Sequence, residues 1–113
     1  MASNLVNAVR ILIAECPYVV TVEDLLTKTR VELEQGYLLD LFYNDTLGKY
    51  AYALILQNRR VVGWDNAPHH GHLPTAPHHF HAADGTVQPS TLTGDPEQDI
   101  FQIIPIINAI LGP

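Results

Sequence analysis

The fold is decided by residues 50–65, which read YAYALILQNRRVVGWD. Over Tyr50–Gln57, one set of alternate positions holds Tyr, Tyr, Leu and Leu, and the other holds Ala, Ala, Ile and Gln. This period of two is typical of a β-strand with one buried face. A turn at Asn58 and Arg59 leads into a second strand, Arg60–Asp65. So short a connection predicts an antiparallel hairpin.

The same alternation extends toward the N-terminus. Residues 31–34 alternate Val and Leu with Glu, Gly36 allows a bulge or bend, and Tyr37–Tyr43 is expected to be another strand. Asn, Asp and Gly residues between positions 44 and 48 supply turn chemistry. Further upstream, the short Tyr18–Val22 is expected to be a strand or an extended connection. Consecutive strands with short turns predict an antiparallel meander.

Both ends of the chain predict helices. Ser3 can cap a first helix that runs to about Cys16, because apolar residues recur there at the spacing of one buried stripe. Asp95 and Pro96 fit the N-cap and the first turn of a second helix that reaches about Leu111. With 113 residues, the chain is expected to form a single α+β domain over residues 1–113. We predict a four- to five-stranded, mostly antiparallel sheet with the N- and C-terminal helices packed against it.

The second helix is apolar around most of its circumference. After Asp99, only Gln102 and Asn108 are polar before Leu111, so the helix should bury more than one face. One face can cover the sheet, and the other is expected to meet a second copy of the chain or a partner protein. Pro105 should kink this helix or divide it in two.

Charge and cysteine content narrow the classes of function. The formal net charge is −6, and an acidic surface repels phosphate backbones, which excludes a broad nucleic-acid-binding surface but not a small nuclease site. Cys16 is the only cysteine and cannot form an intramolecular disulfide. The apolar run Ile100–Leu111 is too short to cross a bilayer, and no secretion signal is expected at the N-terminus. We therefore expect a cytoplasmic protein that does not enter membranes.

The segment that carries chemistry is Asp65–His81. All six His of the chain lie between positions 69 and 81. The pattern Ala-Pro-His-His-x-His occurs twice, at 67–72 and at 76–81, which suggests two similar local conformations that present imidazoles to one place. Prolines restrict the backbone, so this His- and Pro-rich segment, 65–81, is expected to be ordered.

One interpretation of the segment is a metal site. In extended backbone, residues i and i+2 share a face, while His69 and His78 would point elsewhere. The segment then offers two pairs of imidazoles, His70 with His72 and His79 with His81. Such pairs can make a three-His or four-His site for zinc or a similar divalent ion. A divalent-metal-binding module of this kind need not be catalytic.

A second interpretation is general acid–base cleavage of RNA, for which no metal is required. One imidazole can take the proton of the 2′-hydroxyl and another can protonate the departing 5′-oxygen, since the pKa of imidazole is about 6.5. Asp65 can orient an imidazole, and Arg59 or Arg60 can stabilise charge on the phosphate. A packing role competes with both interpretations for any single His. A protein-interaction domain without catalysis is the third alternative.

Three short motifs occur in order: WDNAPHH at Trp64–His70, LPT at Leu73–Thr75 and PHHFH at Pro77–His81. A fourth motif, KYAY at Lys49–Tyr52, precedes them. Over about residues 36–90 these motifs resemble the TumE-type toxins of bacterial toxin–antitoxin modules, in which the fourth motif reads Lys-Tyr-Ser-Tyr. The resemblance implies a small cytoplasmic toxin that is paired with a helix-turn-helix antitoxin and that cleaves RNA or blocks translation.

The resemblance also selects site residues. The family motif carries over to Asp65, Asn66, His69, His70, His78, His79 and His81, whereas a carboxylate is common in the family at the position of His72. We therefore predict a toxin that acts on RNA as an endoribonuclease, with six candidates for acid, base and phosphate contact: Asp65, His69, His70, His78, His79 and His81. If a divalent metal such as zinc is bound, its candidate ligands are His70, His79 and His81. The expected partners are an antitoxin protein, an RNA substrate, and a second copy or another protein at the Ile-rich helix.

Overall fold

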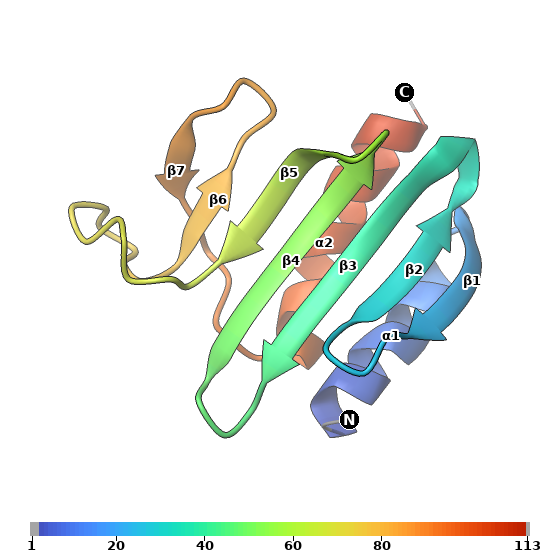
Figure 1. The fold of residues 1–113 in the computed structure, drawn as a ribbon, viewed down its shortest axis with the longest axis horizontal. Coiled ribbons are helices and arrows are strands. Elements are labelled where there is room, and N and C mark those ends of the chain that lie inside the picture. Colours follow the sequence, from blue (N-terminus) through green and yellow to red (C-terminus); the bar gives the residue numbers. More distant parts are fainter. Residues whose placement is uncertain (1–2, 113) are drawn as a thin grey trace.

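The computed structural model describes residues 3–112. Within that range the chain forms, in order, α1 (Ser3–Glu15), β1 (Val19–Asp24), β2 (Thr29–Leu33), a 3-10 turn (Glu34–Gly36), β3 (Tyr37–Asn44), β4 (Lys49–Leu56), β5 (Arg59–Asp65), β6 (His79–His81), β7 (Val87–Pro89) and α2 (Pro96–Leu111). The strands form one sheet in chain order, and all neighbours are antiparallel. Both helices lie on one face of the sheet, and the other face is open (Figure 1). The predicted α+β meander is confirmed.

Across residues 3–112 the sheet has seven strands, more than the four to five that the sequence predicts. β6 and β7 contain three residues each, which is too few for a period of two to be visible in the sequence. β6 extends the sheet because it pairs with the end of β5, where Asp65 lies opposite His79. The His segment therefore returns to the sheet instead of remaining a loop.

The turn of the β4–β5 hairpin lies one residue earlier than predicted. It consists of Gln57 and Asn58, which both have positive φ, 52° and 63°. Two such residues in a row match the right-handed twist of the flanking strands. As a result, Arg59 begins β5 instead of completing the turn.

A β-bulge follows at the start of β5. Ile55 pairs with Arg60, but the preceding residue of β4, Leu54, pairs with Val62. One extra residue of β5 is therefore accommodated, and it reverses the alternation of faces on its N-terminal side. Without the bulge, Arg60 and Gly63 would project from opposite faces, whereas here both lie on the open face.

The face of the sheet that the helices cover forms the core. Leu41, Tyr52 and Trp64 lie side by side on β3, β4 and β5 in the register of the strands, and all are buried. The helices add a second layer of buried aliphatic side chains, each of which stabilises the fold by about 1.5–3 kcal/mol. That layer includes Leu5, Leu12, Ile100, Ile103 and Ile107.

Helix α2 begins and ends where predicted, but Pro105 does not divide it. The Asp95 carboxylate caps it by accepting the backbone N–H of Glu97 at 3.1 Å. The helix then runs through Pro105 to Leu111 without division. Pro105 and the residue four positions before it, Phe101, both lie on the exposed side, so water can reach the carbonyl that proline leaves without an N–H partner.

The second apolar face of α2 is covered within the chain, because it packs against α1 (Figure 1). This contact takes up much of the surface that the sequence assigns to a partner. Phe101 remains 57% exposed. None of the helices formed by residues 3–112 is long and apolar enough to cross a membrane.

Candidate functional site

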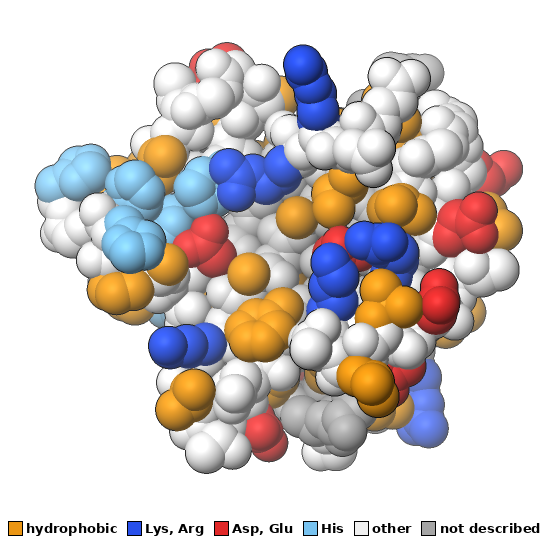
Figure 2. Space-filling view, in the orientation of Figure 1, with side chains coloured by type: hydrophobic (Ala, Val, Ile, Leu, Met, Phe, Trp, Pro, Cys, Tyr) orange, Lys and Arg blue, Asp and Glu red, His pale blue; other side chains and the backbone are white. Residues whose placement is uncertain are grey.

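The open face of the sheet carries a row of side chains that leads into the His segment. In the register of the strands, Phe42, Ala51, Asp65 and His79 lie side by side across β3–β6. His81 follows two residues further along β6 and therefore shares this face. Figure 2 shows the His side chains gathered at one edge of the face, with an acidic side chain next to them.

The carboxylate of Asp65 holds two imidazoles at once. Its Oδ1 atom lies 2.7 Å from Nε2 of His79, and its Oδ2 atom lies 2.8 Å from Nε2 of His81. Oδ1 also accepts the backbone N–H of Ala67 at 3.0 Å. Both carboxylate oxygens are therefore occupied, which fixes the direction of the carboxylate and of both rings.

His79 is the buried member of this group, with 2% of its surface exposed. Its Nδ1–H donates to the carbonyl of Pro77 at 3.0 Å, while its Nε2 faces the Asp65 carboxylate. A neutral imidazole has only one N–H, yet both of these partners are acceptors. Both contacts of His79 are satisfied together only if a proton or another cation lies between Nε2 and the carboxylate.

His70 reaches the same place from the loop that follows β5. Its ring centre lies 4.7 Å from that of His79 and 6.2 Å from that of His81. Partial desolvation lowers the pKa of His70, and the neighbouring imidazoles of His79 and His72 lower it further. His72 is exposed, with its ring centre 6.0 Å from that of His70. The site therefore joins His70 to the predicted His79–His81 pair, with His72 at its outer end.

His78 does not join this cluster. Its Nδ1 atom forms a hydrogen bond with the hydroxyl of Tyr50 at 2.8 Å, and the two rings are stacked. Tyr50 is buried on the helix-covered side, and burial raises the pKa of its hydroxyl, which keeps the hydroxyl protonated as a donor. His78 therefore fastens the loop to the core, as expected for a His one position out of phase with His79.

Within residues 3–112, His69 forms no hydrogen bond or ion pair with the Asp65 carboxylate. It lines the edge of a hollow of about 560 Å³ on the open face, together with Lys49 and Asn66. Asn66 fastens the loop there: its side chain donates to the carbonyl of Gly48 at 2.7 Å and accepts the backbone N–H of Tyr50 at 3.0 Å. Sequence reasoning found Asn66 only through the family resemblance.

Arg60 stands beside the cluster because of the bulge in β5. A Cβ atom placed on Gly63 would lie 2.8 Å from Cδ of Arg60, so the Arg60 side chain runs across Gly63, the residue opposite His81. Arg60 forms no ion pair with any of residues 3–112. Between the two arginines that the sequence singles out, the structure favours Arg60, and the glycine inside a strand is the signal of this close approach.

A second group of charges on the open face is already paired within the sheet. Asp40 is 6% exposed and accepts hydrogen bonds from Lys28 at 2.8 Å and from Nε of Arg30 at 2.8 Å. Burial raises the pKa of Asp40, but the hydrogen bonds from Arg30 and Lys28 outweigh that effect and hold it below its ordinary value. This group therefore stabilises the sheet, and both of its cations are held by the same carboxylate.

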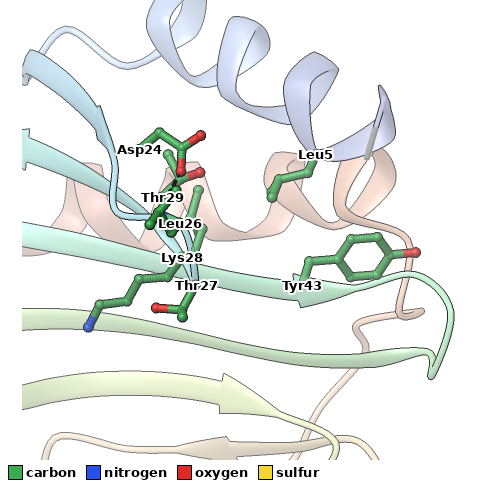
Figure 3. Close-up of a pocket in the computed structure, with 8 residues that line it drawn as sticks. Leu5, Asp24, Leu26, Thr27, Lys28, Thr29 and Tyr43 are labelled. Carbon is green, nitrogen blue, oxygen red and sulfur yellow. Dashed lines mark hydrogen bonds between the residues drawn. The ribbon is translucent and has the colours of Figure 1, made fainter. Parts of the chain in front are cut away.

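Another hollow, of about 90 Å³, lies between the start of α1 and the β1–β2 turn (Figure 3). Leu5 and Tyr43 line one side of it, and Lys28 directs its ammonium group away from Leu5 (Figure 3). Because that ammonium is paired with Asp40, this hollow lacks the grouping of imidazoles and carboxylate found at Asp65.

The Asp65 cluster has a donor set that fits a divalent cation. The ligand atoms of Asp65, His79 and His81 all lie within 4.8 Å of one another. Two imidazoles and a carboxylate suit zinc and several other divalent transition metals, and a backbone carbonyl on the second nitrogen of His79 is the usual support of a metal-binding ring. The structure groups Asp65 with His79 and His81, while the predicted ligand set of His70, His79 and His81 stays a prediction.

Comparison with known proteins adds the family to this geometry. Neither the curated proteins nor the solved structures compared with the chain gave a match. One family model, described as Toxin TumE, matches residues 9–111. The matched range includes the whole His segment and all seven strands of the sheet. The chain belongs to the TumE toxin family.

Proposed function

We propose that this toxin cleaves RNA, and that His70 and His81 carry out the proton transfers. The observation that supports the proposal best is the arrangement of these two half-buried imidazoles, with ring centres 6.2 Å apart, beside one carboxylate. Two imidazoles at such a spacing can contact the oxygens on either side of a phosphate. The open face leaves room for a nucleic-acid strand to approach them.

The two imidazoles divide the proton transfers between them. His81 donates its Nε2–H to Asp65, which leaves its Nδ1 atom available to substrate. One of the two rings takes the proton of the 2′-hydroxyl, whose oxygen attacks phosphorus as the bond to the 5′-oxygen breaks. The other ring gives that 5′-oxygen a proton, so the products are a 2′,3′-cyclic phosphate and a free 5′-hydroxyl. Each such transfer contributes about 10²–10⁴-fold to the rate.

The remaining groups position the rings and balance charge. His79 is almost fully buried, so it acts as a positioning residue that holds Asp65 in place. Arg60 carries an unpaired guanidinium beside His81, where charge develops on the phosphate oxygens during attack. His78 and His69, both candidates from the sequence, have no part in proton transfer in this proposal.

The test is an RNA-cleavage assay on matched variants. His70→Ala and His81→Ala should each lower the cleavage rate at least 100-fold, whereas His72→Ala should leave it within about threefold of the parent protein. His72 is the matched control because it is an exposed His in the same loop. Equal losses in all three variants, or intact RNA with the parent protein at high concentration with and without divalent metal, would refute the proposal.

A divalent-cation site at Asp65, His79 and His81 is the second candidate function. The observation that favours it is that both ring nitrogens of His79 face acceptors, because a cation between Nε2 and the carboxylate would satisfy this arrangement without a second proton. A bound zinc ion would act as a Lewis acid on the phosphate, or the site would bind the metal without a catalytic role. Elemental analysis of the purified protein and of His79→Ala tests this candidate. It fails if neither metal content nor a rise in Tm on adding zinc is observed.

An antitoxin partner follows from the family, and we propose that the chain meets it in the cytoplasm. The predicted use of α2 for a homodimer or partner complex has less support, because α1 covers its second face. The exposed Phe101 on α2 is the point at which to test it. Phe101→Glu should weaken the complex if α2 takes part, and leave its affinity unchanged if the antitoxin binds elsewhere.

A further inference from the structure

We propose that the hollow beside Asp65 binds one unpaired nucleotide of the RNA, next to the phosphate that is cleaved. This inference deepens the proposed function and rests on it. The hollow measures about 560 Å³ and lies on the open face, beside the C-terminal end of β5. Its lining includes Phe42, Lys49, Ala51, Asp65, Pro68 and His69.

Its position ties the hollow to the reacting groups. Asp65 lines the hollow and also holds His79 and His81 through its two carboxylate oxygens. A ligand that fills the hollow is therefore separated from the imidazoles of His79 and His81 only by the Asp65 side chain. In an RNA strand, the group at that distance from a bound nucleoside is its own phosphate, so the occupant and the cleaved bond belong to the same strand.

Its surface suits a nucleobase. The register places Phe42 next to Ala51 and Ala51 next to Asp65, so a small side chain separates the aromatic ring from the carboxylate. Phe42 and Pro68 supply apolar surface on which a base can stack, and every base has such a face. The volume is within the range of small-molecule sites. A larger residue at position 51 would fill the space that Ala51 leaves.

Its charge suits the phosphate of that nucleotide. Lys49 is exposed and forms no ion pair with any part of the chain between residues 3 and 112. The chain has a net charge of −6, which repels anions. An unpaired cation at the edge of an apolar hollow can attract an anionic ligand in spite of this charge. A base inside a duplex is stacked and cannot enter, so the occupant is single-stranded.

Binding of a labelled RNA that cannot be cleaved tests the hollow separately from catalysis. A single-stranded oligonucleotide with 2′-O-methyl groups lacks the attacking hydroxyl, and its Kd is read by fluorescence anisotropy. Phe42→Leu, which removes the ring, and Ala51→Leu, which fills the space, should each weaken binding about tenfold. Lys49→Gln should weaken it and make it less sensitive to salt. Phe101→Leu, the same change at an exposed Phe on α2, should leave the Kd unchanged.

The outcomes separate this inference from the proposed function. An unchanged Kd for both Phe42→Leu and Ala51→Leu, or equal affinity for the duplex form, overturns the nucleotide site even if the protein cleaves RNA. Loss of binding in these variants without cleavage by the parent protein supports the hollow as an RNA site and overturns the catalytic roles of His70 and His81. No binding by the parent protein overturns the inference outright. A Tm within a few degrees of the parent protein shows that each variant is folded.

Discussion

Replacing Asp65 by Asn changes one atom and should cost both stability and activity. The carboxylate accepts two hydrogen bonds, from His81 at 2.8 Å and from the N–H of Ala67 at 3.0 Å, and its Oδ1 atom lies 2.7 Å from Nε2 of His79. The oxygen of Asn can keep the bond to Ala67, but its NH₂ group would face the Nε2–H of His81. The His81 ring must then turn or change its protonated nitrogen, and the contact with His79 loses the negative charge that strengthens it.

The size of the loss follows from these contacts. A hydrogen bond to a charged group contributes about 1.5–3 kcal/mol and a neutral one about 1 kcal/mol. Loss of the hydrogen bond from His81 and weakening of the charged contact with His79 would total about 2–4 kcal/mol, and because the Asp65 side chain is 18% exposed, water recovers part of it. We expect the free energy of unfolding to fall by about 2 kcal/mol and RNA cleavage to fall at least 100-fold.

Urea unfolding at pH 7 measures the first effect, and the cleavage assay measures the second. Asp84→Asn is the matched control, because Asp84 is exposed and accepts hydrogen bonds only within its own turn, from Thr86. An Asp65→Asn protein that is as stable as the Asp84→Asn protein would refute the two-imidazole role of this carboxylate. Lost stability with full cleavage would limit Asp65 to a structural role.

Three further changes probe the surroundings of the site. Tyr50→Phe removes the hydroxyl that is hydrogen-bonded to His78 and should lower the free energy of unfolding by about 1 kcal/mol with cleavage within about threefold; a loss of cleavage well beyond threefold in the folded variant would give His78 a catalytic role. Gly63→Ala places a methyl group 2.8 Å from Cδ of Arg60 and should raise KM for RNA by displacing the guanidinium, and an unchanged KM would remove Arg60 from the site. The pKa of Asp40 is lower in the folded chain than in the unfolded one, so Asp40 contributes stability above the unfolded pKa of about 4, and that stability disappears as the pH falls through the folded pKa. Asp40→Asn should therefore flatten the acid side of the stability profile, and an acid side as steep as that of the parent protein would contradict the pairing with Lys28 and Arg30.

The sequence predicts the long elements well because they repeat their signal. Over Tyr50–Gln57 several successive positions agree on one buried face, and Asp95 with Pro96 marks the start of α2 chemically. β6 has only His79–His81 and was missed, since three residues are too few to show a period. The β5 bulge was missed as well, because its signal is the single residue Gly63, and it decides which face Arg60 takes.

Part of the candidate site was also predictable from strand geometry. His79 and His81 are two residues apart, which predicts that they share one face of a strand. His78 is one residue before His79, which predicts that it points elsewhere. The contacts of Asp65 with both imidazoles were not predictable, because they depend on the pairing of β6 with β5. The same holds for the hollow, which arises from the side-by-side placement of Phe42 and Ala51, residues that look like ordinary strand positions in the sequence.

The most direct test of the central claim is the chemistry of the RNA ends that the toxin produces, compared between the parent protein, His81→Ala and His72→Ala. The account predicts 2′,3′-cyclic phosphate and 5′-hydroxyl ends from the parent protein and from His72→Ala at similar rates, and at least 100-fold less product from His81→Ala. Ends of any other kind, or equal product from His81→Ala and the parent protein, would contradict it.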